Sequence, residues 1–393
     1  MTDYPSKSYG RNAEIASIFK MFEIDKDVSM PGPRRLGKTF VLERLVDSAM
    51  ARGWTAVKVE LAGCRDSQAF FRELCDKIGR CRSKRANLTT WLLQRLHQAT
   101  QPRQDQPGPW YQPFLSHDHQ TYFERLINAL NDDSTQRWAL LIDELPVFLK
   151  ALHDKGADGI AAARDFMNLT SRLRADYPRV RWMITGSIGI EPLARAGNYM
   201  GVLAKFSPFA LEPLSDAQSR DLVQDLAKEG RLRHRQLISD AEADAIVQAV
   251  GWNAAYYLEA LASKLTGEPA NDAGAGSAVA AAVESLLKSG EQTTFGTWEE
   301  HLRKHYQGVE RSRAFSILAA LSPHAGGLNT DTLLAAVGQA TITVAQLRQT
   351  LDRLDADGFV SLRRHDQDKP CAVSFRNLLL RRWWQRYLPN ETA

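Results

Sequence analysis

The sequence predicts an α/β fold in which a parallel β-sheet domain is followed by mostly helical domains. Residues 139–142 and 180–184 form continuous apolar runs, which are typical of strands buried on both faces of a parallel sheet. A glycine-containing segment at residues 32–39 lies between a short, weakly apolar strand and an amphipathic helix. Near the C-terminus, three short helices and a hairpin are predicted to follow one another. These observations indicate one sheet domain and at least one smaller domain.

The length and composition agree with a multidomain protein. A chain of 393 residues is expected to form two or three domains, and its 44% hydrophobic content permits sizeable cores. The net charge of +4 is unevenly placed, because residues 301–393 carry 13 Lys and Arg against 8 Asp and Glu. A basic C-terminal segment hints weakly at an anionic partner.

The cysteines and the apolar runs predict a cytoplasmic protein. Cys64, Cys75, Cys81 and Cys371 form no C-x-x-C pair, which favours reduced, structural thiols. The first ten residues carry no apolar signal segment, and no run reaches the 18 or more apolar residues of a membrane span. We therefore expect no membrane partner.

The segment "GPRRLGKT" at residues 32–39 fits the phosphate-binding pattern G-x-x-x-x-G-K-[ST]. Its glycines let the backbone curl so that N–H groups point at phosphate oxygens, and the following helix directs its N-terminus at the same place. Lys38 is expected to reach the outer phosphates, and the Thr39 hydroxyl to ligate Mg²⁺. The residues expected to contact the nucleotide here are Gly32, Pro33, Arg34, Arg35, Leu36, Gly37, Lys38, Thr39 and Phe40.

Two carboxylates follow the apolar run at residues 139–142. Asp143 is expected to hold Mg²⁺ together with Thr39, directly or through water. Glu144 is expected to polarise the attacking water. Glu144 and Lys38 are therefore the predicted catalytic residues, and Thr39 and Asp143 are the predicted metal ligands.

A third predicted strand, residues 180–184, is followed by Thr185, Gly186 and Ser187. Ligands of open α/β sheets bind at the carboxyl ends of the strands, so a hydroxyl here is placed to sense the γ-phosphate. We assign that role to Ser187. An ordinary glycine-containing turn with capping hydroxyls explains the segment equally well.

These segments carry a resemblance to a known family. The stretches "YGRNAEI", "GPRRLGKT", "LLIDE" and "ITGSIG" resemble the archaeal-type ATPases of the AAA+/STAND group, which also occur in bacteria. The resemblance covers nearly the whole chain. It implies a P-loop NTPase core of the ASCE or AAA+ type, then a helical lid, then a winged-helix domain. It also implies ATP rather than GTP, and the absence of an N-K-x-D motif agrees with that.

The resemblance also assigns residues outside the loop. It places Gly10 and Arg11 beside the adenine. Members of the group often carry Gly-x-Pro in the lid, where the proline approaches the nucleotide. This chain has Gly251, Trp252 and Asn253 at that place, which puts any lid sensor role for Asn253 in doubt.

The predicted domains are a P-loop ATPase core at residues 1–210, a helical lid at 211–290 and a winged-helix domain at 291–393. Ser215 is a good N-cap for the first lid helix. Residues 266–278, "TGEPANDAGAGSA", are the best linker candidate.

The winged-helix prediction leaves its partner open. The third helix, residues 343–358, is the one that would enter a DNA groove, and a hairpin follows it. Its expected exposed face is mixed in sign: Gln346, Arg348, Gln349, Asp352, Arg353 and Asp355. Packing as a regulatory module is therefore an alternative to DNA contact. In the last helix we expect buried tryptophans, with Arg381, Arg382 and Arg386 in water.

The predicted function is that of an ATP-binding and ATP-hydrolysing switch, whose nucleotide state repositions the winged helix. The alternative is a low-turnover, nucleotide-gated protein that binds DNA or recruits a protein partner, such as a regulator, a transposition helper or a defence component. The sequence also leaves open whether the protein forms a homo-oligomer in which an arginine finger from one subunit acts on the nucleotide of another. The candidates for that finger are Arg164, Arg172, Arg174 and Arg195.

Overall fold

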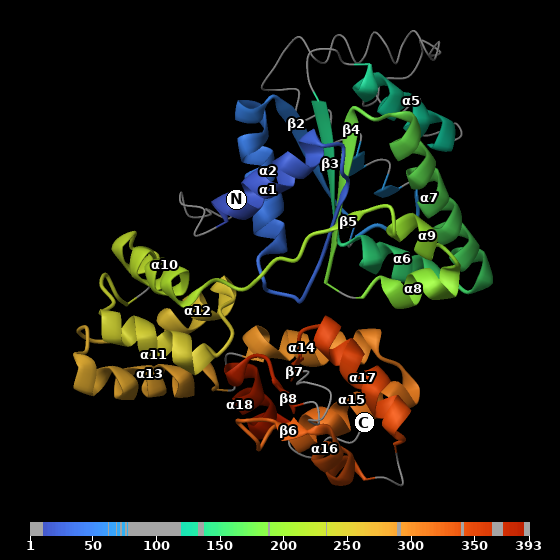
Figure 1. The fold of residues 1–393 in the computed structure, drawn as a ribbon. Helices are drawn as coiled ribbons and strands as arrows, with labels where there is room; N and C mark the ends of the chain where they lie inside the picture. Colours follow the sequence, from blue (N-terminus) through green and yellow to red (C-terminus); the bar gives the residue numbers. More distant parts are fainter. Residues whose placement is uncertain are drawn as a thin grey trace, which may run out of the picture. The chain divides into compact units, whose positions relative to one another are not determined.

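The chain divides into two compact units. The computed structural model describes residues 11–388 except 62, 68, 71–72, 75–76, 78–118, 133–136, 188, 233, 289–291, 339–341 and 364–371. The N-terminal unit consists of residues 11–32 and 38–211. The described part of the C-terminal unit consists of residues 33–37 and 212–388. Figure 1 shows the elements of both units.

A five-stranded parallel sheet forms the centre of the N-terminal unit, in the order β2-β3-β4-β1-β5. The strands are β1 (Val28–Pro31), β2 (Trp54–Glu60), β3 (Arg137–Asp143), β4 (Val180–Gly186) and β5 (Ser207–Pro208). β4 is buried along its whole length, and β3 is buried after its first residue. The apolar runs that predicted these two strands are explained by this central position, because helices cover both faces of the sheet. The predicted α/β fold class is confirmed.

Helices cover the two faces of this sheet unequally. On one face lie α1 (Asn12–Glu23) and α2 (Lys38–Ala49), the latter followed by the short η1 (Met50–Arg52) (Figure 1). The opposite face carries α5 (His119–Asn131), α6 (Leu145–His153), α7 (Ala157–Asp176), α8 (Glu191–Gly197) and α9 (Met200–Leu203). Aromatic side chains fill the core on this second face, where Phe166 packs edge-on against both Phe70 and Phe148. The sheet is therefore a rigid platform for the loops at its carboxyl ends.

A buried ionic cluster fixes the amino ends of the strands. Asp27, just before β1, accepts hydrogen bonds from Arg174 Nε at 2.6 Å and from the backbone N–H of Trp182 at 2.8 Å. Arg174 Nη2 also donates to the carbonyl of Lys205 at 3.0 Å. The side chains of Asp27 and Arg174 are only 5% and 7% exposed. Because a buried charge must be paired, this cluster ties together α7, β1, β4 and the segment before β5.

The C-terminal unit begins with four helices: α10 (Asp216–Lys228), α11 (Asp240–Val250), α12 (Ala255–Ala262) and α13 (Asp272–Leu286). Ser215 caps α10 as predicted, in a reciprocal capping box with Gln218. The prediction of a linker at residues 266–278 is wrong from residue 272 onward. There the Asn271 side chain accepts a hydrogen bond from the N–H of Gly274 and starts an alanine-rich helix. Burial of Ala275, Val279, Ala282, Val283 and Leu286 stabilises this helix despite its two glycines.

The remainder of the unit has winged-helix topology. Its elements are α14 (Gln292–His305), α15 (Gly308–Leu321), β6 (Leu328–Asn329), α16 (Thr330–Val337), α17 (Val344–Ala356), β7 (Val360–Arg363), β8 (Ala372–Phe375) and α18 (Leu378–Tyr387). The strands form an antiparallel sheet in the order β6-β8-β7. Sequence analysis anticipated three helices and the hairpin strands. It missed β6, since two residues are too few to show a pattern.

Internal ion pairs occupy part of the predicted exposed face of α17. Arg353 Nη1 donates to both carboxylate oxygens of Glu310 at 2.6 Å. Asp355 accepts from Arg376 Nη2 at 2.6 Å. Arg353 and Asp355, and also Gln346, are therefore half-buried rather than exposed as expected. The exposed positions of α17 are Val344, Ala345, Arg348, Gln349, Asp352 and Ala356.

The predicted burial of the tryptophans in the last helix is confirmed. Trp383 and Trp384 of α18 are 4% and 0% exposed. Arg382 and Arg386 are exposed, and Arg386 pairs with Glu284 at 2.6 Å. Arg381 differs from the expectation, because it is partly buried and donates to the carbonyl of Ser322 at 2.7 Å. α18 is thus a packing element with a polar outer face.

Candidate nucleotide-binding site

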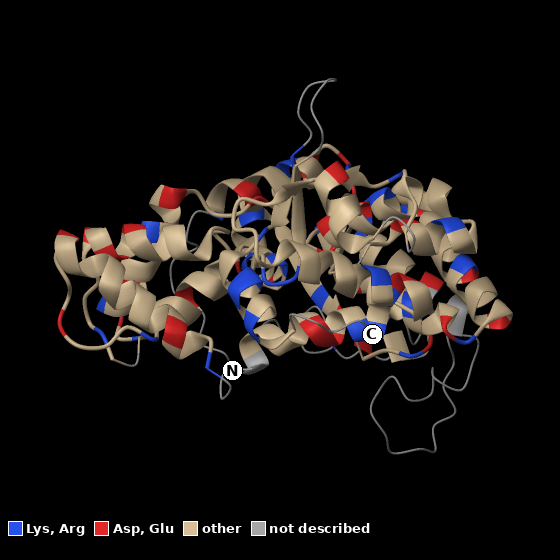
Figure 2. Ribbon diagram, turned by 90° about the horizontal axis from the view of Figure 1, so that it is seen from below, with Lys and Arg blue, Asp and Glu red and all other residues tan. Residues whose placement is uncertain are grey.

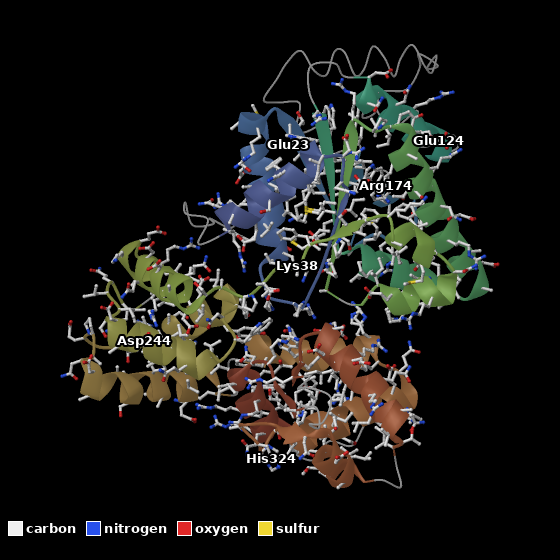
Figure 3. The ribbon with its side chains drawn as sticks, viewed as in Figure 1. Glu23, Lys38, Glu124, Arg174, Asp244 and His324 are labelled. Atoms are coloured by element: carbon white, nitrogen blue, oxygen red, sulfur yellow. The ribbon has the colours of Figure 1, made fainter. Side chains whose placement is uncertain are left out.

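The loop between β1 and α2 has the geometry of a phosphate cradle. Lys38 begins α2, is 6% exposed, and donates from Nζ to the carbonyl of Gly32 at 2.6 Å (Figure 3). Gly32 N–H in turn donates to the carbonyl of Gly186 at 3.3 Å, which fastens the loop to the end of β4. Gly37 has φ +99°, a left-handed conformation that other residues avoid. The loop can therefore curl tightly, and α2 begins directly behind it.

Asp143 connects three elements at the carboxyl edge of the sheet. Thr39 Oγ1, from the first turn of α2, donates to Asp143 Oδ2 at 3.0 Å. Thr185 Oγ1, near the end of β4, donates to Asp143 Oδ1. The Asp143 side chain is 3% exposed. Sequence analysis predicted Thr39 and Asp143 and missed the partnership with Thr185, for which the only signal was a hydroxyl at a strand end.

The donor set at Asp143 fits a magnesium ion. Mg²⁺ is usually held by one or two carboxylates together with waters and substrate phosphates, rather than by a cage of protein ligands. A carboxylate and a threonine hydroxyl meet here beside the loop. Among the described residues, no group of three or more His, Cys, Asp or Glu side chains is placed to hold a metal by itself. The metal site would thus be completed by the nucleotide.

Glu144 and Ser187 are brought together by the ends of β3 and β4. Both the N–H and the Oγ of Ser187 donate to Glu144 Oε2, at 3.1 and 2.8 Å. Glu144 has φ +58° at the N-terminal boundary of α6. A non-glycine residue in this conformation is uncommon and is held there by its surroundings. Ser187 therefore positions the carboxylate of Glu144.

Lys58 is a further charged residue of this region that sequence analysis missed. It lies on β2, and its Nζ is 3.2 Å from Glu43 Oε1 and 3.8 Å from Asp143 Oδ2. The only signal in the sequence was a lysine among the apolar residues Ala56, Val57 and Val59 of this strand. Its partners are distant in the chain, so the sequence pattern did not reveal them.

The other residues predicted to contact the nucleotide interact with neighbours in their own unit. Arg11 is 5% exposed and its Nη1 donates to Glu14 Oε1 at 2.7 Å, whereas Gly10 lies outside the described residues. Within the C-terminal unit, the guanidinium of Arg35 lies 4.0 Å from the ring centre of Tyr256. Arg34 Nη1 donates to the carbonyl of Thr297 at 3.4 Å. Of the others, Pro33 and Leu36 are buried, and Phe40 is half-buried.

The four arginines considered as fingers have different surroundings. Arg174 is removed from the set, because it is buried against Asp27 at the opposite end of the sheet from the loop. Arg164 Nε donates to the carbonyl of Gly197 at 2.7 Å, and Arg172 pairs with Glu124. Arg195 is exposed on α8, and its side chain makes no hydrogen bond or ion pair with any described residue.

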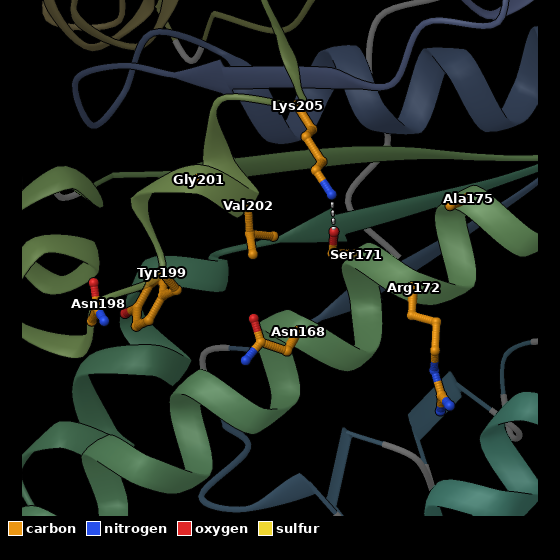
Figure 4. Close-up of a pocket in the computed structure, with 9 residues that line it drawn as sticks. All are labelled: Asn168, Ser171, Arg172, Ala175, Asn198, Tyr199, Gly201, Val202 and Lys205. Atoms are coloured by element: carbon orange, nitrogen blue, oxygen red, sulfur yellow. Dashed lines mark hydrogen bonds between the residues drawn. The ribbon is translucent and has the colours of Figure 1, made fainter.

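A separate hollow lies on the N-terminal unit, away from Asp143. It has a volume of about 520 Å³ and is lined by residues of α7 and of the segment from Asn198 to Lys205. Lys205 Nζ donates to Ser171 Oγ at 2.9 Å across it, and the Arg172 side chain points away from that pair (Figure 4). The hollow shares no residue with the loop or with the carboxylates.

Two further expectations concern thiols and membranes. Cys64 is a free, buried thiol, and burial raises its pKa to about 11, with a smaller contribution from nearby carboxylates. The other three cysteines lie outside the described residues. None of the described helices combines the length and apolar character needed to cross a bilayer.

Comparison with solved structures agrees with the fold. A Walker-type ATPase of Pyrococcus abyssi matches with a TM-score of 0.63 and 14% identity, over 96% of each chain. The Aeropyrum pernix ORC2 protein, solved as ADPNP–ADP complexes, matches with a TM-score of 0.53 and 13% identity, over 96% of this chain and 92% of that one. No protein-family model and no curated protein matches the chain.

At such low identity, the likeness establishes a shared fold and nothing finer. The chain has the fold of the archaeal AAA+ ATPases, with a parallel α/β core and a C-terminal winged helix. The predicted resemblance to these ATPases is therefore confirmed at the level of the fold.

Proposed function

We propose that the protein binds ATP with Mg²⁺ and hydrolyses it. The observation that carries the proposal is the meeting of Thr39, Asp143 and Thr185 beside a loop closed by Lys38. This arrangement gathers a cation, a carboxylate and hydroxyl groups at the carboxyl ends of parallel strands, where ligands of such sheets bind. The nucleotide complexes of the similar Aeropyrum pernix protein support the choice of ligand.

Binding would rest on charge neutralisation around the phosphates. The loop from Gly32 to Phe40 supplies backbone N–H groups, and the N-terminus of α2 favours an anion. Lys38 would exchange its carbonyl partner Gly32 for the outer phosphates. Thr39 and Asp143 would hold Mg²⁺, which neutralises the charge that develops on the phosphates. Arg11, together with Gly10, would lie beside the adenine.

Hydrolysis would depend on the carboxylate of Glu144. A carboxylate can orient and polarise the attacking water. The two hydrogen bonds from Ser187 restrict the rotation of that carboxylate. Ser187 would therefore link the end of β4, next to the outer phosphate, to the group that activates water.

The direct test is calorimetry with ATP and Mg²⁺, followed by multiple-turnover phosphate release. We expect saturable binding of one nucleotide and a phosphate yield that exceeds the protein concentration many times over. If ATP does not bind at all, the proposal is wrong.

We further propose that the nucleotide state repositions the winged helix. The supporting observation is that Arg34 and Arg35, at the loop, contact Thr297 of α14 and Tyr256 of α12. A phosphate that draws these guanidinium groups inward would weaken both contacts. Hydrogen exchange of α12 and α14 should differ between the ATP-bound and ADP-bound protein. Equal exchange in the two states would contradict the switch.

The second candidate is a low-turnover, nucleotide-gated protein that binds DNA or recruits a protein partner. It is favoured by the winged-helix topology and by the exposed face of α17, where Arg348 and Gln349 point to solvent. Acidic and basic residues are interspersed along the helices (Figure 2), so docking onto protein remains an alternative to DNA. Phosphate release measured with and without duplex DNA separates the candidates, because a gated binder stops near one turnover.

A further inference from the structure

Lys58 places a positive charge between two carboxylates beside the proposed metal site. Its Nζ is 3.2 Å from Glu43 Oε1 on α2 and 3.8 Å from Asp143 Oδ2 at the end of β3. The exposed fractions are 18% for Lys58, 32% for Glu43 and 3% for Asp143. The three side chains come from three different elements of the same unit, so the backbone fixes their arrangement.

The position of Lys58 follows from the alternation of β2 and the period of α2. Residues 58 and 60 share one face of β2, and Glu60 is the register partner of Asp143 on β3. Glu43 lies four residues after Thr39, so both face the same side of α2. A lysine that lies mostly buried between a strand and a helix loses part of its hydration, which costs free energy unless nearby carboxylates compensate its charge. The carboxylates of Glu43 and Asp143, which Lys58 neutralises, explain the presence of this lysine.

The surroundings of Asp143 show why a cation is suited to this place. The Asp143 carboxylate is almost fully buried, and among the described residues its side-chain hydrogen-bond partners are the hydroxyl groups of Thr39 and Thr185. Hydroxyl groups do not cancel its charge. Glu43 adds a second carboxylate, whose Oε2 is buried and accepts no hydrogen bond from the described residues. Lys58 is the cation that compensates both.

We infer that Lys58 is a positioning residue that holds Asp143 in its metal-free form and thereby reduces the dependence of nucleotide binding on Mg²⁺. The inference rests on the proposed function. Without Mg²⁺, the ammonium of Lys58 offsets the repulsion between Asp143 and the phosphates. With Mg²⁺, the same ammonium repels the ion and weakens its binding. Both effects lower the ratio of nucleotide affinity with Mg²⁺ to that without it.

The test measures binding of a fluorescent ADP analogue by anisotropy, once at saturating Mg²⁺ and once in EDTA. In Lys58→Met, we expect the ratio of the two affinities to rise about tenfold over the wild type. Lys58→Arg keeps the charge and should stay near the wild-type ratio. Glu43→Gln leaves Lys58 less compensated, so we expect the ratio to fall below the wild-type value.

The control is Lys20→Met, which makes the same charge change at an exposed position on α1. It should leave the ratio unchanged. Because the readout is a ratio for one protein, a partly unfolded sample affects both measurements alike. Glu43→Gln provides a second variant with the opposite expected shift if Lys58→Met folds poorly. If the affinity ratios of Lys58→Met and Glu43→Gln both stay within twofold of the wild-type ratio, Lys58 does not affect the Mg²⁺ dependence of nucleotide binding. Binding of the ADP analogue would still support the proposed function. If the wild type binds no nucleotide, both proposals fail.

Discussion

Lys38 is the residue on which nucleotide binding depends most directly. It is buried at the start of α2, and its ammonium faces the loop carbonyl of Gly32. Lys38→Ala should abolish ATP binding, because a partly desolvated triphosphate would lose a neutralising charge, a cost on the order of several kcal/mol. Calorimetry measures the loss, and Lys26→Ala, at an exposed position, serves as control. Unchanged affinity in Lys38→Ala would remove the loop from the proposed site.

Substitution of Glu144 should separate ATP binding from ATP hydrolysis. Glu144→Gln keeps a side-chain oxygen that can accept both hydrogen bonds from Ser187, so the local geometry should persist. The amide cannot polarise water as a carboxylate does, and we expect hydrolysis to slow by roughly a hundredfold or more with ATP affinity retained. Phosphate release is the measurement, with Glu23→Gln at an exposed position of α1 as the matched change. A variant that turns over at the wild-type rate would exclude Glu144 as the catalytic carboxylate.

At the scale of elements, the junction between β4 and α6 controls where Glu144 lies. A Cβ added at Gly186 would overlap the ring of Pro146 in the first turn of α6. Gly186→Ala should therefore push α6 away from β4, at a cost of about 1–3 kcal/mol in unfolding free energy, and slow ATP hydrolysis. The control is Gly189→Ala, whose nearest contact would be Pro192 Cδ at 3.6 Å. Equal denaturation midpoints and rates for both variants would contradict this account.

The second prediction at the scale of elements concerns the buried ionic cluster around Asp27. Asp27→Ala leaves Arg174 and the N–H of Trp182 without their buried partner. Removing one member of a buried pair typically costs about 3–5 kcal/mol. Asp47→Ala removes an ion pair with Arg44 in which Asp47 is 66% exposed, so we expect a change of about 1 kcal/mol or less. Urea unfolding compares the two. A similarly small loss of unfolding free energy in both variants would mean that Asp27 is not essential to the stability of the sheet.

At the scale of the whole molecule, DNA contact would come from the basic end of the chain. Arg363 is exposed at the end of β7, whereas Arg364 and Lys369, which the sequence predicts to lie in the same hairpin, are outside the described residues. Arginines at a wing tip meet phosphates more readily than base edges, so binding should be largely independent of sequence. Each phosphate contact should contribute about one unit to the slope of log affinity against log salt.

The corresponding variant reverses the charge of Arg363 and Arg364 together. We expect the affinity for all duplex sequences to fall similarly, and ATP binding to remain. The control reverses the charges of Lys20 and Lys26, which are both exposed in the N-terminal unit. It makes the same change in net charge and should lower the affinity for duplex DNA less. If the wild type binds no duplex at low salt in either nucleotide state, the hairpin serves as a solvated surface or docks onto protein.

Much of this molecule follows from local sequence. The buried strands, the loop before α2 and the N-cap at Ser215 were predictable because they depend on runs of apolar residues and on backbone chemistry within a few residues. Thr39 and Asp143 were predictable as neighbours, since the carboxyl ends of parallel strands meet at one edge. The burial of Trp383 and Trp384 was expected for a different reason, because large aromatic side chains usually pack against the rest of their domain.

Only the tertiary structure decided which charges meet. Lys58 faces Asp143 because β2 and β3 pair with Glu60 opposite Asp143, a register set by strands far apart in the chain. In the sequence, Arg174 was as plausible an arginine finger as the other three candidates. The packing of α7 on β4 buries it against Asp27. A local pattern gives the face on which a side chain lies. The partner across that face depends on the long-range pairing of strands and helices, which no short stretch of sequence encodes.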